Sequence, residues 1–146
     1  MPNTEYENAL KSALNILNYA DNTEKKLREK LRSRGYSRSA VDEAVVYLKR
    51  YRYLDDRRFM ERAVNHYANV KLYGARRIIS SLYAKGFARE DIESLDFDEY
   101  GIDFVELCRK RIEKTASRYK SREALVAALL RYGFSYSEIK EATTDK

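Results

Sequence analysis

Residues 27–41 read LREKLRSRGYSRSAV, and the spacing within this stretch decides the fold. Leu27 and Leu31 precede Gly35 by eight and four positions. An aromatic residue follows the glycine directly, and Val41 comes six positions after it. Aliphatic residues four apart lie on one face of a helix, and a glycine supplies the left-handed conformation that ends a helix at little steric cost. The stretch therefore predicts a helix, a sharp turn and a second helix.

The same pattern returns twice, around Gly86 and Gly133, so that the three glycines are 51 and 47 residues apart. The other members of the later copies are Ile78, Leu82, Phe87 and Ile92, and then Leu125, Leu129, Phe134 and Ile139. Each copy alone indicates only a packed helical hairpin. The threefold recurrence indicates a repeat array in which each unit packs mainly on its neighbours.

Capping and helix-breaking residues divide the chain further. Thr23, Ser37 and Ser135 stand at expected N-caps, and Ser135 with Glu138 has the spacing of a capping box. The expected helices cover residues 4–20, 23–34 and 37–51 in a first repeat, and 55–70, 75–85 and 89–95 in a second. We predict repeats at 1–54, 55–100 and 101–146, with an acidic, irregular connector at 95–100. The fold class is therefore all-α, with three tandem three-helix repeats of helix-turn-helix type.

Composition agrees with an all-helical protein rich in exposed charge, since 36% of the 146 residues are charged and there is one proline. No segment has 18 uninterrupted apolar residues, and the first twelve lack the features of a signal peptide. We expect a cytoplasmic protein that does not enter membranes. The one cysteine, Cys108, can form no internal disulfide, which fits a reducing compartment. Phe104 and Ile112, four positions away on either side, predict a buried thiol in preference to a reactive one.

Residues for catalysis are hard to find. The one histidine, His66, is expected on a helix surface or in packing, and no Cys or His cluster has metal-ligand spacing. No glycine-rich phosphate loop is present. Asp55 and Asp56 could hold a metal, but adjacent carboxylates at a helix start fit an N-cap and the helix dipole better. The sequence predicts a non-enzymatic protein without a metal or cofactor.

Positive charge, with a net value of +6, is concentrated on particular helices. The candidate contact residues in the first repeat are Lys25, Lys26, Arg28, Lys30, Arg32 and Arg34. In the second repeat Arg76, Arg77 and Lys85 keep three of these registers, and Arg89 keeps that of Arg38. The third repeat carries its cations on its first helix, as Arg109, Lys110, Arg111, Lys114, Arg118 and Lys120, of which Arg109 and Lys110 are candidates. A charge run is usually a solvated face, but charge that recurs at one register favours a row facing a polyanion or an acidic protein groove.

The aromatic residues allow two interpretations. Tyr36, Phe87 and Phe134 belong to the repeat pattern and are expected in the core. Four tyrosines lie outside it, where they either pack between repeats or stack on bases. These are Tyr51, Tyr53, Tyr73 and Tyr132.

Two stretches resemble signatures of the RecX family. Residues 53–61, YLDDRRFME, resemble its Y-L-D-D-x-x-F-x-x signature, of which Tyr53, Leu54, Asp55, Asp56 and Phe59 are the matching positions. Residues 30–37, KLRSRGYS, resemble its K-L-x-x-[KR]-G-[YF]-S segment. Gly35, Gly86 and Gly133 match the glycines of the family copies, and the resemblance spans residues 9–142. Where the family often has a proline, this chain has Gly74-Ala75, which we expect to alter that turn alone.

The resemblance implies an elongated, curved body and a function that composition does not give. It implies a regulator that occupies the groove of the RecA filament and limits its extension or promotes its disassembly. The recombinase, ATPase and co-protease activities of RecA, and with them the SOS response, are thereby restrained. We expect a monomer that contacts RecA, with single- or double-stranded DNA as a further candidate partner. The alternative is an autonomous DNA-binding module of helix-turn-helix type.

Overall fold

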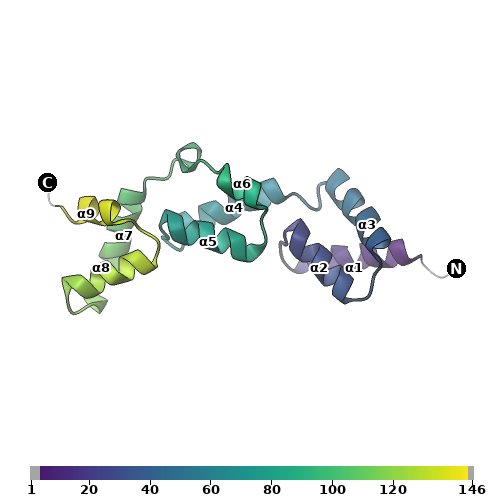
Figure 1. The fold of residues 1–146 in the computed structure, drawn as a ribbon, viewed down its shortest axis with the longest axis horizontal. Helices are drawn as coiled ribbons and strands as arrows, with labels where there is room; N and C mark the ends of the chain where they lie inside the picture. The colour runs from purple at the N-terminus through teal and green to yellow at the C-terminus, as the bar shows by residue number, and fades with distance from the viewer. Residues whose placement is uncertain (1–3, 145–146) are drawn as a thin grey trace. The chain divides into compact units, whose positions relative to one another are not determined.

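The computed structural model describes residues 4–144, which contain nine α-helices, two short 3-10 helices and no strand (Figure 1). The α-helices are α1 (Glu5–Tyr19), α2 (Glu24–Ser33), α3 (Arg38–Arg50), α4 (Asp56–Asn69), α5 (Ala75–Lys85), α6 (Arg89–Glu93), α7 (Phe104–Thr115), α8 (Arg122–Arg131) and α9 (Tyr136–Thr143). The 3-10 helices are η1 (Phe97–Tyr100) and η2 (Ala116–Arg118). The all-α prediction is confirmed.

Side chains at the predicted N-caps start the helices. The Thr23 hydroxyl accepts from the Lys26 amide at 3.2 Å, and the Ser37 hydroxyl accepts from the Ala40 amide at 3.2 Å. Ser135 and Glu138 exchange both hydrogen bonds of a capping box, at 3.0 and 2.8 Å. These hydrogen bonds confirm the predicted caps. The caps were predictable because each depends on contacts between residues close in sequence.

Glycines end the second helix of each predicted repeat. Gly35, Gly86 and Gly133 have φ of +94°, +94° and +99°. At the first and last of these turns, the amide after the glycine donates back to the fourth residue before the glycine, so that Tyr36 binds Leu31 and Phe134 binds Leu129. These bonds satisfy carbonyls that the helix end would leave without a donor.

The connector after α6 differs from the prediction. Residues 97–100, expected to be irregular, form η1, and α6 ends at Glu93 where the prediction ran to residue 95. The Asp96 carboxylate accepts from the Asp98 amide at 3.0 Å and so starts η1. Gly101, with φ of +67°, ends it. The acidic residues interpreted as loop formers thus cap a short helix.

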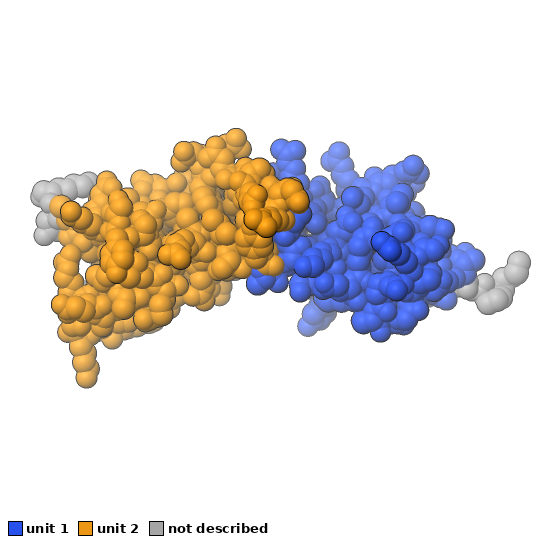
Figure 2. Space-filling model, in the orientation of Figure 1, with its two compact units in different colours: residues 1–61, 84–88 blue, residues 62–83, 89–146 orange. Residues whose placement is uncertain are grey.

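The chain forms two compact units, one of residues 1–61 with 84–88 and one of residues 62–83 with 89–146 (Figure 2). In the first unit α1 packs on α3 and α2 contacts both, around a core that includes Leu27, Leu31 and Leu48. In the second unit α9 contacts α7 and α8. The predicted repeat boundaries remain a prediction, because the unit boundaries fall within α4 and α5.

A buried threonine joins the first two repeats. Thr23 is fully buried, and its hydroxyl donates to the Lys85 carbonyl at 3.0 Å while it caps α2. A Cβ added at Gly86 would lie 2.8 Å from the Thr23 hydroxyl oxygen. The turn after α5 therefore seats directly on the N-terminus of α2, and only a glycine fits there without a shift.

Equivalent residues join the next two repeats by a close approach of backbone to backbone. Gly74 stands 51 residues after Thr23, and its amide donates to the Tyr132 carbonyl at 2.7 Å. A Cβ at Gly74 would lie 2.3 Å from the Gly133 carbonyl carbon, and a Cβ at Gly133 would lie 2.4 Å from the Arg77 amide nitrogen. The turn after α8 is thus docked on the start of α5 as the turn after α5 is docked on α2.

The first turn glycine and the last of the equivalent helix-start residues take no part in such a junction. Gly35, the first turn glycine, is exposed, and an added Cβ would meet nothing within 4 Å. Ser121, 47 residues after Gly74, caps α8 and is also exposed. Each junction therefore uses the turn of one repeat and the helix start of the repeat before it.

We expect Thr23→Val to lower the free energy of unfolding by about 2 kcal/mol, because it removes an N-cap and a buried hydrogen bond together. Thr4→Val is the matched control, since Thr4 caps α1 through the Glu7 amide and is exposed. It should cost about 1 kcal/mol or less. Urea unfolding followed by circular dichroism measures both. An equal loss in the two variants would show that the Lys85 contact contributes nothing.

We expect Gly133→Ala to destabilise more than Gly35→Ala. Both glycines have nearly the same φ, so both variants bear a left-handed penalty of about 1–2 kcal/mol. Only the Gly133 variant also overlaps the α5 backbone, which should add about 1–3 kcal/mol. The two midpoints of thermal unfolding provide the comparison. Equal midpoints would contradict the close approach at this junction.

Candidate functional site

Most of the predicted cations on α2 and the turn after it are engaged in contacts within the chain. The Lys30 ammonium donates to the Asn22 side chain at 2.6 Å, the Arg32 guanidinium to the Tyr36 carbonyl at 3.1 Å, and the Arg34 guanidinium to the Ser12 hydroxyl at 2.6 Å. Lys26 lies along the Gly86 turn, and its ammonium is 3.8 Å from the Glu29 carboxylate. These side chains first serve the packing and capping of α2.

Arg28 is the centre of an ion-pair network. Its guanidinium contacts the carboxylates of Glu24 at 2.9 Å and Asp42 at 2.5 Å, and Lys49 also pairs with Glu24 at 2.9 Å. Burial alone would raise the pKa of Glu24, but the hydrogen bonds from Lys49 and Arg28 lower it overall. Burial would lower the pKa of Arg28, and its bonds to Asp42 and Glu24 raise it. Arg28 is thus committed to joining α2 to α3.

The two adjacent arginines of α5 differ in role. Arg77 is half-buried, donates to the Arg131 carbonyl at 3.2 Å and lies over the rings of Tyr73 and Tyr132, at 4.8 and 5.8 Å from their centroids. Those two rings stack on each other with centroids 6.3 Å apart. Arg76 is exposed and uses only its backbone amide, toward Gly133. Arg77 therefore holds the junction together, and Arg76 presents its charge to solvent.

The other predicted contact residues also divide into cations with an internal partner and cations without one. Arg109 is 3.5 Å from Glu106, and the Lys85 ammonium is 5.9 Å from the centre of the Phe59 ring. Within residues 4–144, three of the predicted cations are exposed with no partner for their side chains. These are Lys25, Arg76 and Lys110. They are the members of the predicted set that can meet a partner without breaking an internal contact.

The YLDD stretch has a structural use in this chain. Leu54 is buried, Asp55 caps α4 by accepting from the Arg58 amide at 3.1 Å, and the Asp56 carboxylate accepts from the Glu24 amide at 3.0 and 3.2 Å. The Phe59 ring lies 5.0 Å from that of Phe87. The adjacent carboxylates therefore start two different helices, α4 and α2. In the described part of the chain no group of three or more His, Cys, Asp or Glu side chains is placed to hold a metal.

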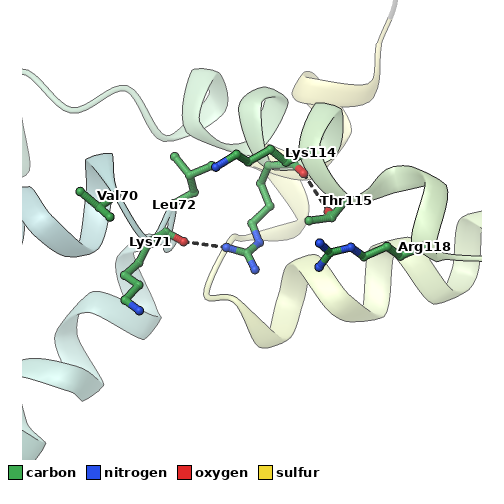
Figure 3. Close-up of a pocket in the computed structure, with 7 residues that line it drawn as sticks. Val70, Lys71, Leu72, Lys114, Thr115 and Arg118 are labelled. Carbon is green, nitrogen blue, oxygen red and sulfur yellow. Dashed lines mark hydrogen bonds between the residues drawn. The ribbon is translucent and has the colours of Figure 1, made fainter.

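A basic pocket lies in the second unit, where the loop after α4 meets α7 and η2 (Figure 3). It has a volume of about 310 Å³ and is lined by Val70, Lys71, Leu72, Arg111, Lys114, Thr115 and Arg118. Four of these seven residues are cations and none is acidic. The sequence indicates positive charge on this helix, but Arg109 and Lys110, the candidates predicted there, do not line the pocket. The usable signal was the spacing of Arg111, Lys114 and Arg118, which places them on one helical face.

An apolar hollow of about 470 Å³ lies in the first unit, and sequence reasoning did not predict it. It is lined by Tyr6, Asp42, Glu43, Val46, Tyr47, Arg50 and Tyr51. Val46 and Tyr51 are 61% and 57% exposed, and the Tyr47 and Tyr51 rings are 4.6 Å apart. The periodicity of α3 predicts its core face, and Val46 falls outside that face.

The remaining chemically reactive side chains take the predicted positions. Cys108 is buried, and this burial, with the nearby Glu138 carboxylate, raises its pKa to about 11. The thiol therefore stays protonated at neutral pH. His66 is exposed on α4, with its ring 5.9 Å from that of Tyr67. None of the helices within residues 4–144 combines the length and apolar content needed to cross a bilayer.

Comparison with known proteins gives the relationship directly. A sequence profile described as RecX, first three-helix domain, matches residues 9–48, and one described as RecX, second three-helix domain, matches residues 55–94. The crystal structure of RecX from Lactobacillus salivarius is similar with a TM-score of 0.78 and 28% identity, over 94% of both chains. A crystal structure of a regulatory protein RecX, at 22% identity and a TM-score of 0.81, shares the fold.

Curated relatives extend the likeness beyond the two matched domains. Regulatory protein RecX of Clostridioides difficile is 33% identical over 141 residues, which is 92% of this chain and 66% of that protein. Regulatory protein RecX of Caldanaerobacter subterraneus is 31% identical, over 94% of this chain and 70% of that protein. The chain thus spans about two thirds of the length of these relatives. With its two profile matches and its three-helix architecture, the chain belongs to the RecX family of regulatory proteins.

Proposed function

We propose that the chain is a regulator that binds the RecA nucleoprotein filament. By occupying the filament groove it limits extension or promotes disassembly, and so restrains recombinase, ATPase and co-protease activity. The observation that carries this proposal is the match of two successive three-helix domains to the RecX family. The role requires no reaction by this chain, which acts as a cytoplasmic monomer without a cofactor.

The distribution of charge supports a binding role and reduces the number of candidate contact residues. Lys25 and Arg76 hold the same register in α2 and α5, and both are exposed without internal partners. Arg28 and Arg77, which share the predicted row, are half-buried and hold the chain together. We therefore assign the filament contacts to Lys25 and Arg76 before the others.

The apolar hollow supports a protein partner. Tyrosine and arginine are enriched at protein interfaces, and an aromatic side chain in a hollow is a common energetic centre of binding. Tyr47, Tyr51 and Arg50 meet at this hollow beside the exposed Val46. A phosphate backbone would gain little from such a surface, whose nearby Asp42 and Glu43 are acidic.

The test is Lys25→Glu combined with Arg76→Glu, measured by co-sedimentation with preformed RecA filaments. We expect binding to weaken at least about tenfold, since each attractive contact becomes repulsive. The control is Lys11→Glu with Lys140→Glu, which makes the same change in net charge at exposed positions of α1 and α9. Circular dichroism should show equal helicity in both. Equal filament binding by the two variants would contradict the assigned contacts.

Two measurements distinguish the filament proposal from the autonomous DNA-binding alternative: the salt dependence of affinity and binding to DNA without RecA. A protein that neutralises about six phosphates should lose on the order of 10³ in affinity between 50 and 200 mM salt. The filament proposal predicts that binding to naked DNA is weaker than binding to filaments at the same salt. Binding to a preferred duplex sequence as tight as filament binding would favour the alternative.

A further inference from the structure

The basic pocket has one preorganised member, Arg111. Its guanidinium donates to the Lys71 carbonyl at 2.6 Å, and its carbon lies 3.2 Å from the centre of the Tyr132 ring. Thr115 fixes the helix beneath it by donating to the Arg111 carbonyl at 2.8 Å. Stacking and a short hydrogen bond hold a guanidinium in one orientation. Arg111 is therefore set in place before any ligand arrives.

Arg111 also has one hydrogen-bond donor without an acceptor and a positive charge without a neighbouring carboxylate. Its Nε is buried and has no hydrogen-bond partner among the described residues. A buried donor without an acceptor is unfavourable, and more so when it belongs to a charged group. No carboxylate in residues 4–144 lies within 4 Å of the charged ends of Arg111 or its three cationic neighbours. An anion in the pocket would supply the missing charge.

Three further cationic residues line the same pocket, of which Lys71 turns its backbone carbonyl toward Arg111 and its side chain away (Figure 3). Figure 3 shows Lys114 and Arg118 extending toward the loop that carries Lys71. The C-terminal ends of α4 and α7 meet here, and helix ends attract cations. Arg111 already serves the end of α4 through the Lys71 carbonyl. Helix ends therefore account for Arg111 and favour Lys114, which is in the last turn of α7. Within residues 4–144, however, no side-chain hydrogen bond or ion pair engages Lys71, Lys114 or Arg118.

The loop that carries Lys71 is held in a costly conformation. Leu72 has φ of +54°, in the left-handed region that a leucine rarely adopts. The amides of Val70 and Lys71 both donate to the His66 carbonyl, and the Tyr73 amide donates to the Tyr67 carbonyl. Strain of this kind persists only where surrounding contacts impose it, and it collects at ligand sites. Here it turns Leu72 into the core and keeps Lys71 beside Arg111.

We propose that this pocket binds a phosphate group, through Lys114 and Arg118 with Arg111 as its fixed base. Guanidinium and ammonium groups are the usual partners of phosphate, because the guanidinium fork matches its oxygens and the ammonium adds a point charge. A volume of about 310 Å³ admits a phosphate with part of its substituent. The group could belong to a nucleic-acid backbone or to a small phosphorylated ligand. The proposal does not rest on the RecA role.

The experiment uses the full chain labelled with ¹⁵N and two probes at constant ionic strength, inorganic phosphate and a single-stranded oligonucleotide. We expect amide shifts centred on residues 70–72 and 111–118. Lys114→Gln with Arg118→Gln should weaken binding at least about tenfold. Lys120→Gln with Lys140→Gln removes the same charge from exposed positions outside the pocket and should change affinity less than about twofold.

The two probes identify the source of the phosphate. Shifts at the pocket with both probes support recognition of the group itself, whereas shifts with the oligonucleotide alone assign it to a nucleic-acid backbone. In that case the salt dependence of the Lys114 and Arg118 variant should be shallower by about one for each lost contact. Shifts with inorganic phosphate alone support a small ligand. Shifts with neither probe, or equal weakening in the two double variants, would overturn the proposal.

Discussion

The close approach of a turn glycine to a helix start is the contact on which this structure depends. At one junction Gly86 meets the buried Thr23, and at the other Gly133 meets Gly74 at backbone distance. Neither contact leaves room for a side chain at the turn. Each contact lies within one compact unit, and nearly every substitution at the turn glycine would displace the atoms that it approaches. Steric complementarity at these glycine turns therefore contributes to the packing, together with the burial of apolar side chains.

These junctions also decide what the basic residues can do. Lys26 and Arg77 hold equivalent positions and both lie against the glycine turn that docks beside them. Their neighbours Lys25 and Arg76 point their charge to solvent. Adjacent residues in a single register of positive charge therefore have different surroundings. The packing of the repeats engages one cation of each pair and leaves the other exposed.

Local rules made much of the fold predictable from sequence. Residues within four positions of each other determine the N-caps at Thr23 and Ser37 and the left-handed turn glycines. These caps and turns in turn set where the helices begin and end. The contact of Gly74 with Gly133 spans 59 residues, and no local pattern encodes it. For the same reason Lys71 could not be placed beside Arg111 and Tyr132. The 3-10 helix at residues 97–100 is not predictable in this way, because an acidic run is typical of a loop and the capping role of Asp96 has no separate signal in the sequence.

The most direct test of the regulatory account is single-stranded-DNA-dependent ATP hydrolysis by preformed RecA filaments, with this protein added well below one molecule per RecA. Binding to the same DNA without RecA is measured beside it at the same salt. A regulator that acts in the filament groove should suppress hydrolysis at a ratio where little DNA is bound directly. Inhibition that begins only when the protein saturates the DNA, or no inhibition at any ratio, would contradict the account.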